Sequence, residues 1–315
     1  MLTFVSKRLL ALVPTMLVLA VAVFAMVALA PGDPARFIAG ADAPDDQVEV
    51  VRQDLGLDEP LVSQYLNYVG DLAHLDLGRS AVTAEPVTDM AWRTLPRTAT
   101  IAGLALLIAI VLSVPLGTLA ALRKGSWPDR LVNGGSALFM SLPPFVIGAL
   151  LIMLLTTGGL GWLPAVGYVS PTESLGGWLQ HAILPALALA SLPVAELTRQ
   201  LRGSLVDNLE EDYVRTARAK GLLRRTVIGK HAGKNAMTAY LTVVGLSVAR
   251  LTGAAVLVEP MFGIYGFGAL GVNAAFRRDL PLLQGVVLIN AVIILGANLL
   301  VDLAQGLFNP RLRTA

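Results

Sequence analysis

Six runs of apolar residues dominate the pattern of this chain. A helix needs roughly 20 such residues to cross a hydrocarbon core about 30 Å thick, because each residue adds about 1.5 Å. Lipid offers no partner to an unpaired backbone N–H or C=O group, so a helix is expected in each run. The predicted spans cover residues 9–30, 99–122, 131–156, 182–201, 238–258 and 282–308.

The composition also indicates a membrane protein. Of the 315 residues, 55% are hydrophobic and 15% are charged, whereas soluble domains carry about 25% charged residues. The formal net charge is only +2, which gives no reason to expect nucleic acid as a partner. The chain has no cysteine, so disulfides, thiolate metal sites and a cysteine nucleophile are excluded.

The first apolar run also has features of a secretory signal peptide. Lys7 and Arg8 precede it, and "ALA" at 28–30 imitates a cleavage site. The run is 22 residues long, whereas the apolar region of a signal peptide has about 7–15 residues. A retained span is therefore the preferred interpretation.

The distribution of Lys and Arg residues indicates the orientation of the spans. With six spans, one side of the membrane holds 16 of these residues and the other side holds 7. The positive-inside rule then places both termini and the loop 203–237 in the cytoplasm. The predicted domains are an N-terminal tail with the first span (1–30), an extracytoplasmic loop subdomain with 12 acidic residues (31–95) and a core of five spans (96–315).

Seven of the basic residues lie within 211–236, in a loop between apolar runs. The segment "EEDYVRTARAK" has acids early and bases late, as the helix dipole favours, so it is expected to be helical. Gly221 then ends this helix, and "LLRRTVIGKHAGKNA" predicts a second one. Such a pair suits docking into a groove of a partner protein. A basic determinant of topology that touches anionic lipid is an equally good interpretation of the pattern alone.

Several ionisable residues fall inside the predicted spans, where a charge costs on the order of 3 kcal/mol and usually has a use. Arg250 lies midway along the fifth span and is the best candidate for lining a water-filled path. The alternatives for Arg250 are a pair with Asp302 or Glu259, and exposure to lipid. Glu196 and Arg199 are three residues apart, so they are expected to pair with each other.

The sequence lacks the motifs of several enzyme classes. It has no G-x-x-x-x-G-K-[ST] to cradle a nucleotide, no H-E-x-x-H and no G-x-S-x-G. The three histidines, His74, His181 and His231, fall in separate regions of the predicted topology, so a shared metal site is not expected. An intramembrane enzyme and a passive channel or receptor-like scaffold stay open as alternatives.

The basic loop resembles the "EAA" cytoplasmic loop of ABC importer permeases, in the form "DYVRTARAKGL…H…N" that is typical of the oligopeptide, dipeptide and nickel permease family. The resemblance is to the "B"-type dipeptide permease subunit and covers nearly the whole chain. Each string is weak alone, but their order and spacing make a strong match. The matching strings are "SKRLLALVPTMLVLAVAVFAMVALAPGDPA", "LGLDEPLVSQYLNYV", "LDLGRS", "HAILPALALA", "GAAVLVEPMFGIYGFG", "RRDLPLLQGVVL" and "NLLVDLAQGLFNPRLR".

The resemblance implies an all-α polytopic membrane protein with six transmembrane helices, like the type I ABC importer permeases, in a bacterial cytoplasmic membrane. It implies a second homologous permease, two cytoplasmic ATPases that bind the ATP, and an extracytoplasmic substrate-binding protein as partners, with no cofactor of its own. Short peptides are the favoured substrate, with nickel chelates, glutathione and opines as alternatives. Arg250 and Glu259 are possible path residues. The implied ATPase-coupling residues are Tyr213, Arg215, Ala217, Ala219, Lys220, Gly221, Leu222, Leu223, Arg224, His231 and Asn235.

The chain departs from the family pattern in a few places. Arg215, Thr216 and Ala217 replace the usual core of the loop motif, including its Glu. Ala239 stands where family members commonly have Pro. This last departure leaves the angle between the loop and the fifth span open.

Overall fold

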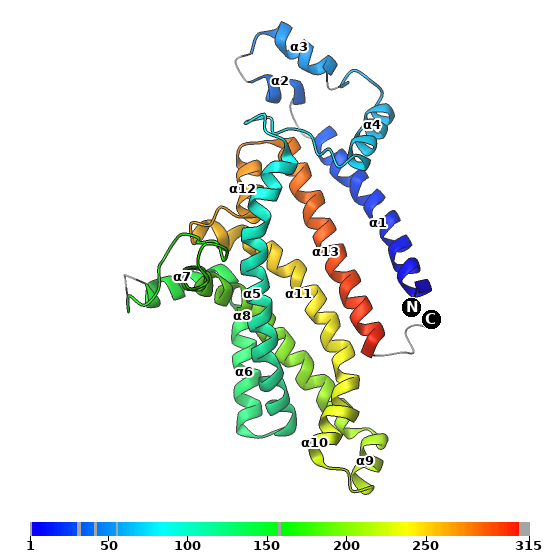
Figure 1. Ribbon diagram of the computed structural model, residues 1–315, viewed down its shortest axis with the longest axis vertical. Coiled ribbons are helices and arrows are strands. Elements are labelled where there is room, and N and C mark those ends of the chain that lie inside the picture. Colours follow the sequence, from blue (N-terminus) through cyan, green and yellow to red (C-terminus); the bar gives the residue numbers. More distant parts are fainter. Residues whose placement is uncertain (1, 30–32, 41–42, 55, 157–158, 309–315) are drawn as a thin grey trace. The chain divides into compact units, whose positions relative to one another are not determined.

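A computed structural model of the protein describes residues 2–29, 33–40, 43–54, 56–156 and 159–308. Over these residues the secondary structure is helical apart from one isolated β-bridge, between Arg79 and Pro86, which confirms the all-α prediction (Figure 1). The helices are α1 (Leu2–Ala28), α2 (Pro34–Ala39), α3 (Asp45–Asp54), α4 (Leu61–Ala73), α5 (Val87–Leu122), α6 (Trp127–Ser141), α7 (Pro144–Leu155), α8 (Leu175–Glu210), α9 (Asp212–Ala219), α10 (Arg224–Thr226), the π-helix η1 (Val227–Gly233), α11 (Lys234–Met261), α12 (Phe267–Phe276) and α13 (Leu280–Phe308).

The described residues form two compact units. One comprises 2–5, 97–264 and 296–308, and the other comprises 6–96 and 265–295. The second unit therefore contains most of α1, the predicted loop subdomain, α12 and the first half of α13. In this unit the buried carboxylate of Asp279 accepts hydrogen bonds from the Ser80 hydroxyl and the Ala81 amide, at 2.5 and 3.0 Å, which joins segments about 200 residues apart in sequence.

Four stretches of the described helices are long and apolar enough to cross a membrane: α5, α8, residues 224–261 and residues 280–305. They include the predicted second, fourth and fifth spans and residues 282–305 of the predicted sixth span. The apolar part of α1, residues 12–28, lies in the predicted first span but is shorter. The helices extend well past the apolar runs, since α5 and α8 have 36 residues each.

The prediction of a single helix over residues 131–156 is wrong. This region contains two helices, α6 and α7, whose axes are bent by 101° at a break. Pro143 and Pro144 cause the break, because neither has an N–H to donate and proline disfavours the helical conformation of the residue before it. Leu142 accordingly has an extended backbone, with φ −102° and ψ 126°.

The helix α8 is at the centre of the packing in its unit. Of an apolar stretch of 18 residues in α8, 67% is buried, compared with 22% of the corresponding stretch in α5. The helices α6, α7, α9, η1 and α11 all pack against it. Pro185 and Pro193 lie inside α8, and the helix continues through both. Small residues form much of the buried surface, including Ala182, Ala186, Ala188, Ala190 and Ala195.

An ion pair joins the start of α6 to α8. Asp129 is buried, and its two carboxylate oxygens accept from Nε and Nη2 of Arg202, both at 2.7 Å. The amide of Gly125 and the side chain of Asn133 complete the hydrogen bonds of this carboxylate, at 2.9 and 2.7 Å. A buried charge that is paired and fully hydrogen-bonded in this way is tolerated at low cost.

Gly117 on α5 tests the tightness of the packing on α8. A Cβ added there would lie 2.9 Å from the backbone oxygen of Thr198, closer than real Cβ atoms come. We expect Gly117→Ala to destabilise the protein by about 1–3 kcal/mol, the usual cost of overpacking, and to lower its melting temperature in detergent.

The matched control for this prediction is Gly103→Ala on the same helix, where an added Cβ meets nothing within 4 Å. This variant should be neutral or more stable by up to about 1 kcal/mol, because alanine is the better helix former. Equal melting temperatures for the two variants would show that α5 and α8 are not in close backbone contact.

Candidate functional site

The basic loop begins with a helix that is anchored to the membrane core. α9 follows α8 at Glu211 and confirms the first predicted loop helix. Its inner face carries Val214 and Ala217, both buried in the same hydrophobic cluster as Leu205 of α8 and Tyr240 of α11. Ala217, one of the predicted coupling residues, thus packs inside the chain. Ala219 is exposed.

The second loop helix is not a separate element, which corrects the prediction. α10 begins at Arg224, passes into η1 and continues without a break into α11. The fifth helical span therefore starts 14 residues before the predicted residue 238. The continuation is possible because Ala239, unlike proline, has an N–H group and no ring that would clash with the preceding turn. The π-helical turns of η1 lie at the junction between loop and span, and such turns occur frequently at functional sites.

Gly221 makes the turn between α9 and α10. Its φ is +75°, in the left-handed region that favours glycine. Its amide donates to the carbonyl of Arg218 at 2.9 Å. An added Cβ would meet nothing within 4 Å, so the bulk of a side chain would be accommodated in this chain. The requirement for glycine here is one of backbone conformation.

Two of the predicted coupling residues, Tyr213 and Asn235, are brought together by the fold. The hydroxyl of Tyr213 donates to Oδ1 of Asn208 at 2.9 Å and accepts from Nδ2 of Asn235 at 3.0 Å. This bridge ties α9 to the end of α8 and to the start of α11. Sequence reasoning missed Asn208, whose nearness to Tyr213 depends on the turn at Glu211.

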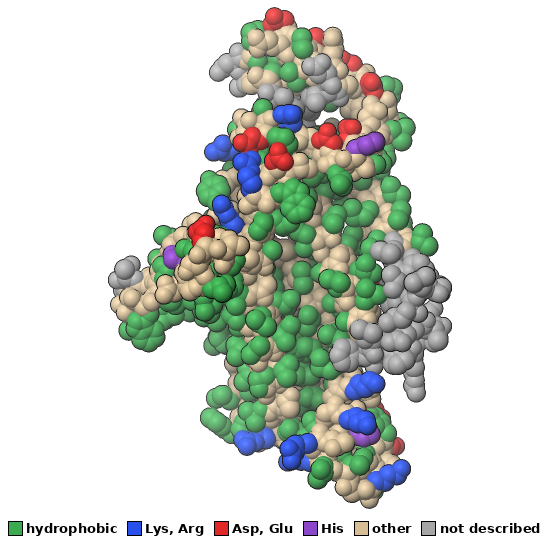
Figure 2. Space-filling view, viewed as in Figure 1, with side chains coloured by type: hydrophobic (Ala, Val, Ile, Leu, Met, Phe, Trp, Pro, Cys, Tyr) green, Lys and Arg blue, Asp and Glu red, His purple; other side chains and the backbone are tan. Residues whose placement is uncertain are grey.

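Beyond α9 the loop presents exposed side chains. Leu223 is 71% exposed and Leu222 is 41% exposed, although both are apolar. Lys220, Arg224 and Arg225 are exposed beside them. Figure 2 shows Lys and Arg side chains gathered over the end of the unit that carries α9 and α10. Exposed leucines among cations are typical of a surface that a partner covers.

The remaining predicted coupling residues lie apart from the bridge. Arg215 is exposed and pairs with Asp212 one turn earlier, at 3.1 Å. His231 is half-buried within η1. Among the described residues, neither forms a hydrogen bond or ion pair with Tyr213 or Asn235.

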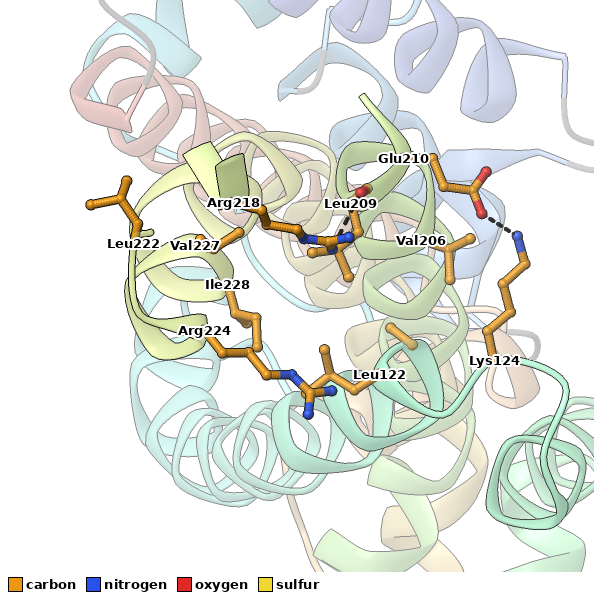
Figure 3. Close-up of a pocket in the computed structure, with 11 residues that line it drawn as sticks. Leu122, Lys124, Val206, Leu209, Glu210, Arg218, Leu222, Arg224, Val227 and Ile228 are labelled. Atoms are coloured by element: carbon orange, nitrogen blue, oxygen red, sulfur yellow. Dashed lines mark hydrogen bonds and ion pairs between the residues drawn. The ribbon is translucent and has the colours of Figure 1, made fainter. Parts of the chain in front are cut away.

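A groove of about 480 Å³ lies between the loop and the ends of α5 and α8. In Figure 3, the guanidinium groups of Arg218 and Arg224 reach it from two sides. Arg218 donates to the carbonyl of Leu209 at 3.5 Å, and Lys124 pairs with Glu210 at 2.5 Å at the rim. The other lining residues are Ala121, Leu122, Val206, Leu222, Val227 and Ile228.

A second polar cluster lies within the spans, and its pairing differs from the prediction. Arg250 forms an ion pair with Glu196 of α8, rather than Glu196 with Arg199. Arg199 instead contacts the sulfur of Met140, at 3.3 Å. Residues three apart on a helix share a face only approximately. Here the packing of α11 on α8 brings Arg250, rather than Arg199, within ion-pair distance of Glu196. The Arg250 side chain is 46% exposed and that of Glu196 is 13% exposed.

Glu259, the other predicted path residue, is buried at the end of α11. Its Oε1 accepts a hydrogen bond from the hydroxyl of Thr98 on α5. The surrounding residues, among them Phe262 and Ile264, are also buried. Because its side chain is covered within the chain, a place for Glu259 along a transport path stays a prediction.

Comparison with known proteins gives two family matches that together span nearly the whole chain. Residues 113–314 match the family described as "binding-protein-dependent transport system inner membrane component". Residues 1–102 match the N-terminal family of membrane components of the same transport systems.

Individual relatives agree with these matches. A protein of Brucella abortus (strain 2308), whose name describes a peptide transport system permease, is 38% identical over 313 residues, which is 99% of each chain. A glutathione transport system permease protein of Escherichia coli (strain K12) is 40% identical over 314 residues, again 99% of each chain. The similarity therefore covers nearly the whole of this chain and of each relative.

The Tyr213 bridge can be tested without any partner. Tyr213→Phe removes both hydrogen bonds, each worth about 1 kcal/mol, so we expect amide exchange in residues 212–219 to become roughly fivefold faster or more. The measurement is hydrogen exchange followed by mass spectrometry. As a control, Arg215→Gln removes an exposed ion pair worth about 0–1 kcal/mol and should change the rate less. Unchanged exchange in Tyr213→Phe would contradict the anchoring of α9 by this bridge.

Proposed function

The chain belongs to the family of inner membrane components of binding-protein-dependent transport systems, and from this premise we propose that its loop 203–237 transmits force from a cytoplasmic ATPase to the membrane helices. The supporting observation is that α9 is anchored to α8 and α11 while the residues beyond it are exposed. A partner that moves the loop would therefore move both helices.

The docking surface of the loop is the exposed stretch 218–225. Leu222 and Leu223 provide apolar contact area, and the surrounding cations suit an acidic rim on the partner. Gly221 sets the direction of this stretch relative to α9. The α9 face that carries Val214 and Ala217 is already buried and takes no part in docking.

The full assembly follows from the same proposal. Two ATPases bind and hydrolyse ATP, a second homologous permease completes the path, and an extracytoplasmic binding protein delivers the substrate. The chain itself has no nucleotide-binding motif and acts without enzymatic activity of its own. Both termini and the loop 203–237 face the cytoplasm, in accordance with the positive-inside rule and with 16 basic residues on that side. Dependence on ATP distinguishes this function from that of a passive channel.

Short peptides are the proposed substrates. The relatives are named as permeases for peptides and for glutathione, which is itself a short peptide. Arg250 and Glu196 would line the path for such solutes. A charge that reaches hydrocarbon costs on the order of 3 kcal/mol, so the partly exposed Arg250 is best accommodated beside water. Its pairing with Glu196 would keep both charges in place between transport events.

The role of Gly221 can be tested with two substitutions that differ in backbone preference. Valine strongly disfavours a positive φ, and the strain amounts to about 1–3 kcal/mol. We expect Gly221→Val to reduce substrate-stimulated ATP hydrolysis roughly tenfold in the reconstituted complex, since each 1.4 kcal/mol is about tenfold. Less ATPase should also remain on the purified permease. Insertion and orientation should not change.

The matched control is Gly221→Asn, because asparagine adopts the left-handed region with little strain. It adds a side chain of similar size, for which the structure has space, and should retain most of the coupling. If valine and asparagine behave alike, or if both match the wild type, the loop does not dock through the turn at Gly221.

Exchanging the charges of Arg250 and Glu196 distinguishes a role of Arg250 in the transport path from a purely structural role. Arg250→Ala leaves the mostly buried Glu196 without its partner, so we expect both transport and stability to fall, stability by about 1–3 kcal/mol. The exchanged pair, Glu196→Arg with Arg250→Glu, restores the attraction and should recover the melting temperature. Peptide uptake should stay at least about tenfold lower in this variant, because the charge beside the path is reversed. Recovery of uptake together with stability would show that the pair is only structural.

A further inference from the structure

The unit formed by residues 6–96 and 265–295 contains a cavity that the coupling loop and the path do not use. Its volume is about 400 Å³, within the range of small-molecule sites. The end of α1, the length of α4 and the segment that leads into α13 line it. The lining residues include Phe24, Tyr68, Asp71 and Arg278.

Tyr68 has a hydroxyl that is buried without a hydrogen-bond partner among the described residues. Burial, and secondarily the neighbouring Tyr65, raises the pKa of Tyr68 to about 12, so the phenol stays protonated at neutral pH. An unpaired buried hydroxyl is unfavourable, and natural proteins rarely keep one without a reason. A ligand atom that accepts this proton would remove the penalty.

Two opposite charges also line the cavity. Asp71 and Arg278 are both exposed, and neither side chain has a hydrogen bond or ion pair within the part of the chain that the structure describes. The other two charged lining residues are already used, because Arg52 pairs with Asp33 at 2.6 Å. The cavity therefore offers one carboxylate and one guanidinium whose charges are not matched within the chain.

Arg278 is held in its position by the backbone around it. Its φ is +55°, which is unfavourable for a residue other than glycine. The next residue, Asp279, is buried and accepts from the Ser80 hydroxyl, the Ala81 amide and the Leu282 amide, at 2.5, 3.0 and 3.3 Å. These bonds fix the wall that Ala81 and Arg278 contribute to the cavity. Unfavourable backbone conformations that are held in this way occur preferentially at ligand sites.

The lining of the cavity also includes apolar residues, among them Phe24, Val27 and Leu61. The ring of Phe24 on α1 lies 5.8 Å from the ring of Tyr68 and 5.5 Å from that of Tyr65, measured between centroids. A few polar groups that converge on an aromatic wall are the usual composition of a site for a small organic ligand.

We propose that this cavity binds a small zwitterionic ligand, with its ammonium group at Asp71, its carboxylate at Arg278 and a polar atom that accepts from the Tyr68 hydroxyl. A dipeptide has both charges and an amide oxygen for the third contact. The assignment rests on the proposed function only for the choice of a peptide as the probe, because the cavity and its charges are observed independently of it.

The first test uses the full-length chain alone, purified in lipid nanodiscs, with calorimetric titration of alanyl-alanine and its two blocked forms. We expect the free dipeptide to bind with a Kd of about 1 mM or tighter. N-acetylation and C-terminal amidation, which remove one charge each, should weaken binding by roughly tenfold, since each removes a charge-assisted hydrogen bond.

Variants assign each contact to its residue. Asp71→Asn should abolish the preference for the free over the acetylated dipeptide, and Arg278→Gln should abolish the preference for the free over the amidated one. Tyr68→Phe should weaken all three ligands by about threefold to tenfold, as expected for one hydrogen bond. Its melting temperature should not fall, because only an unpaired hydroxyl is removed.

Matched controls are Asp58→Asn and Arg277→Gln, which remove the same charges from exposed residues that do not line the cavity. Both should bind as the wild type does. The proposal is overturned if the wild type shows no binding at a dipeptide concentration about tenfold above the expected Kd. It is also overturned if blocked and free dipeptides bind equally. Because no ATPase is present, a negative result here leaves the test of Gly221 unaffected, and a negative result there leaves this site unaffected.

Discussion

The burial of α8 among its neighbours is the constraint on which the membrane core depends. Apolar side chains gain little from moving out of hydrocarbon, so helices in a membrane associate mainly through close packing of small residues. The alanine-rich surface of α8 and the backbone approach at Gly117 supply such packing. Because α6, α7, α9, η1 and α11 all pack on α8, its position determines where the loop and the polar residues of the spans lie.

Two charges of α8 are tolerated because neighbouring helices supply partners for them. Arg202 pairs with Asp129 of α6, and Glu196 pairs with Arg250 of α11. Loss of one member of such a pair is costly in a poorly solvated place. In the proposed mechanism, α9 would apply force to the two helices that carry the second pair, which joins the coupling loop to the path through α8 and α11.

The sequence predicted helices in the right places but not their extent. The fourth span was predicted as residues 182–201, whereas α8 extends from Leu175 to Glu210, because a helix continues past the hydrocarbon wherever its polar residues find water or partners. The break at Pro143 was visible in the sequence, but apolar run length alone counted residues 131–156 as one span. The Tyr213–Asn235 bridge was out of reach, since its residues are 22 positions apart and meet only through the turn at Gly221.

By itself, the sequence determined that the chain is helical, that it belongs in a membrane and that one loop is strongly basic. These properties depend on apolar run length, composition and charge distribution, which are local. The tertiary structure decided which side chains meet: Arg250 with Glu196 rather than Glu196 with Arg199, and Ala217 with the buried cluster of α8 and α11. Such choices depend on how α8, α9 and α11 pack, and contacts between helices are not encoded in the periodicity of any one of them.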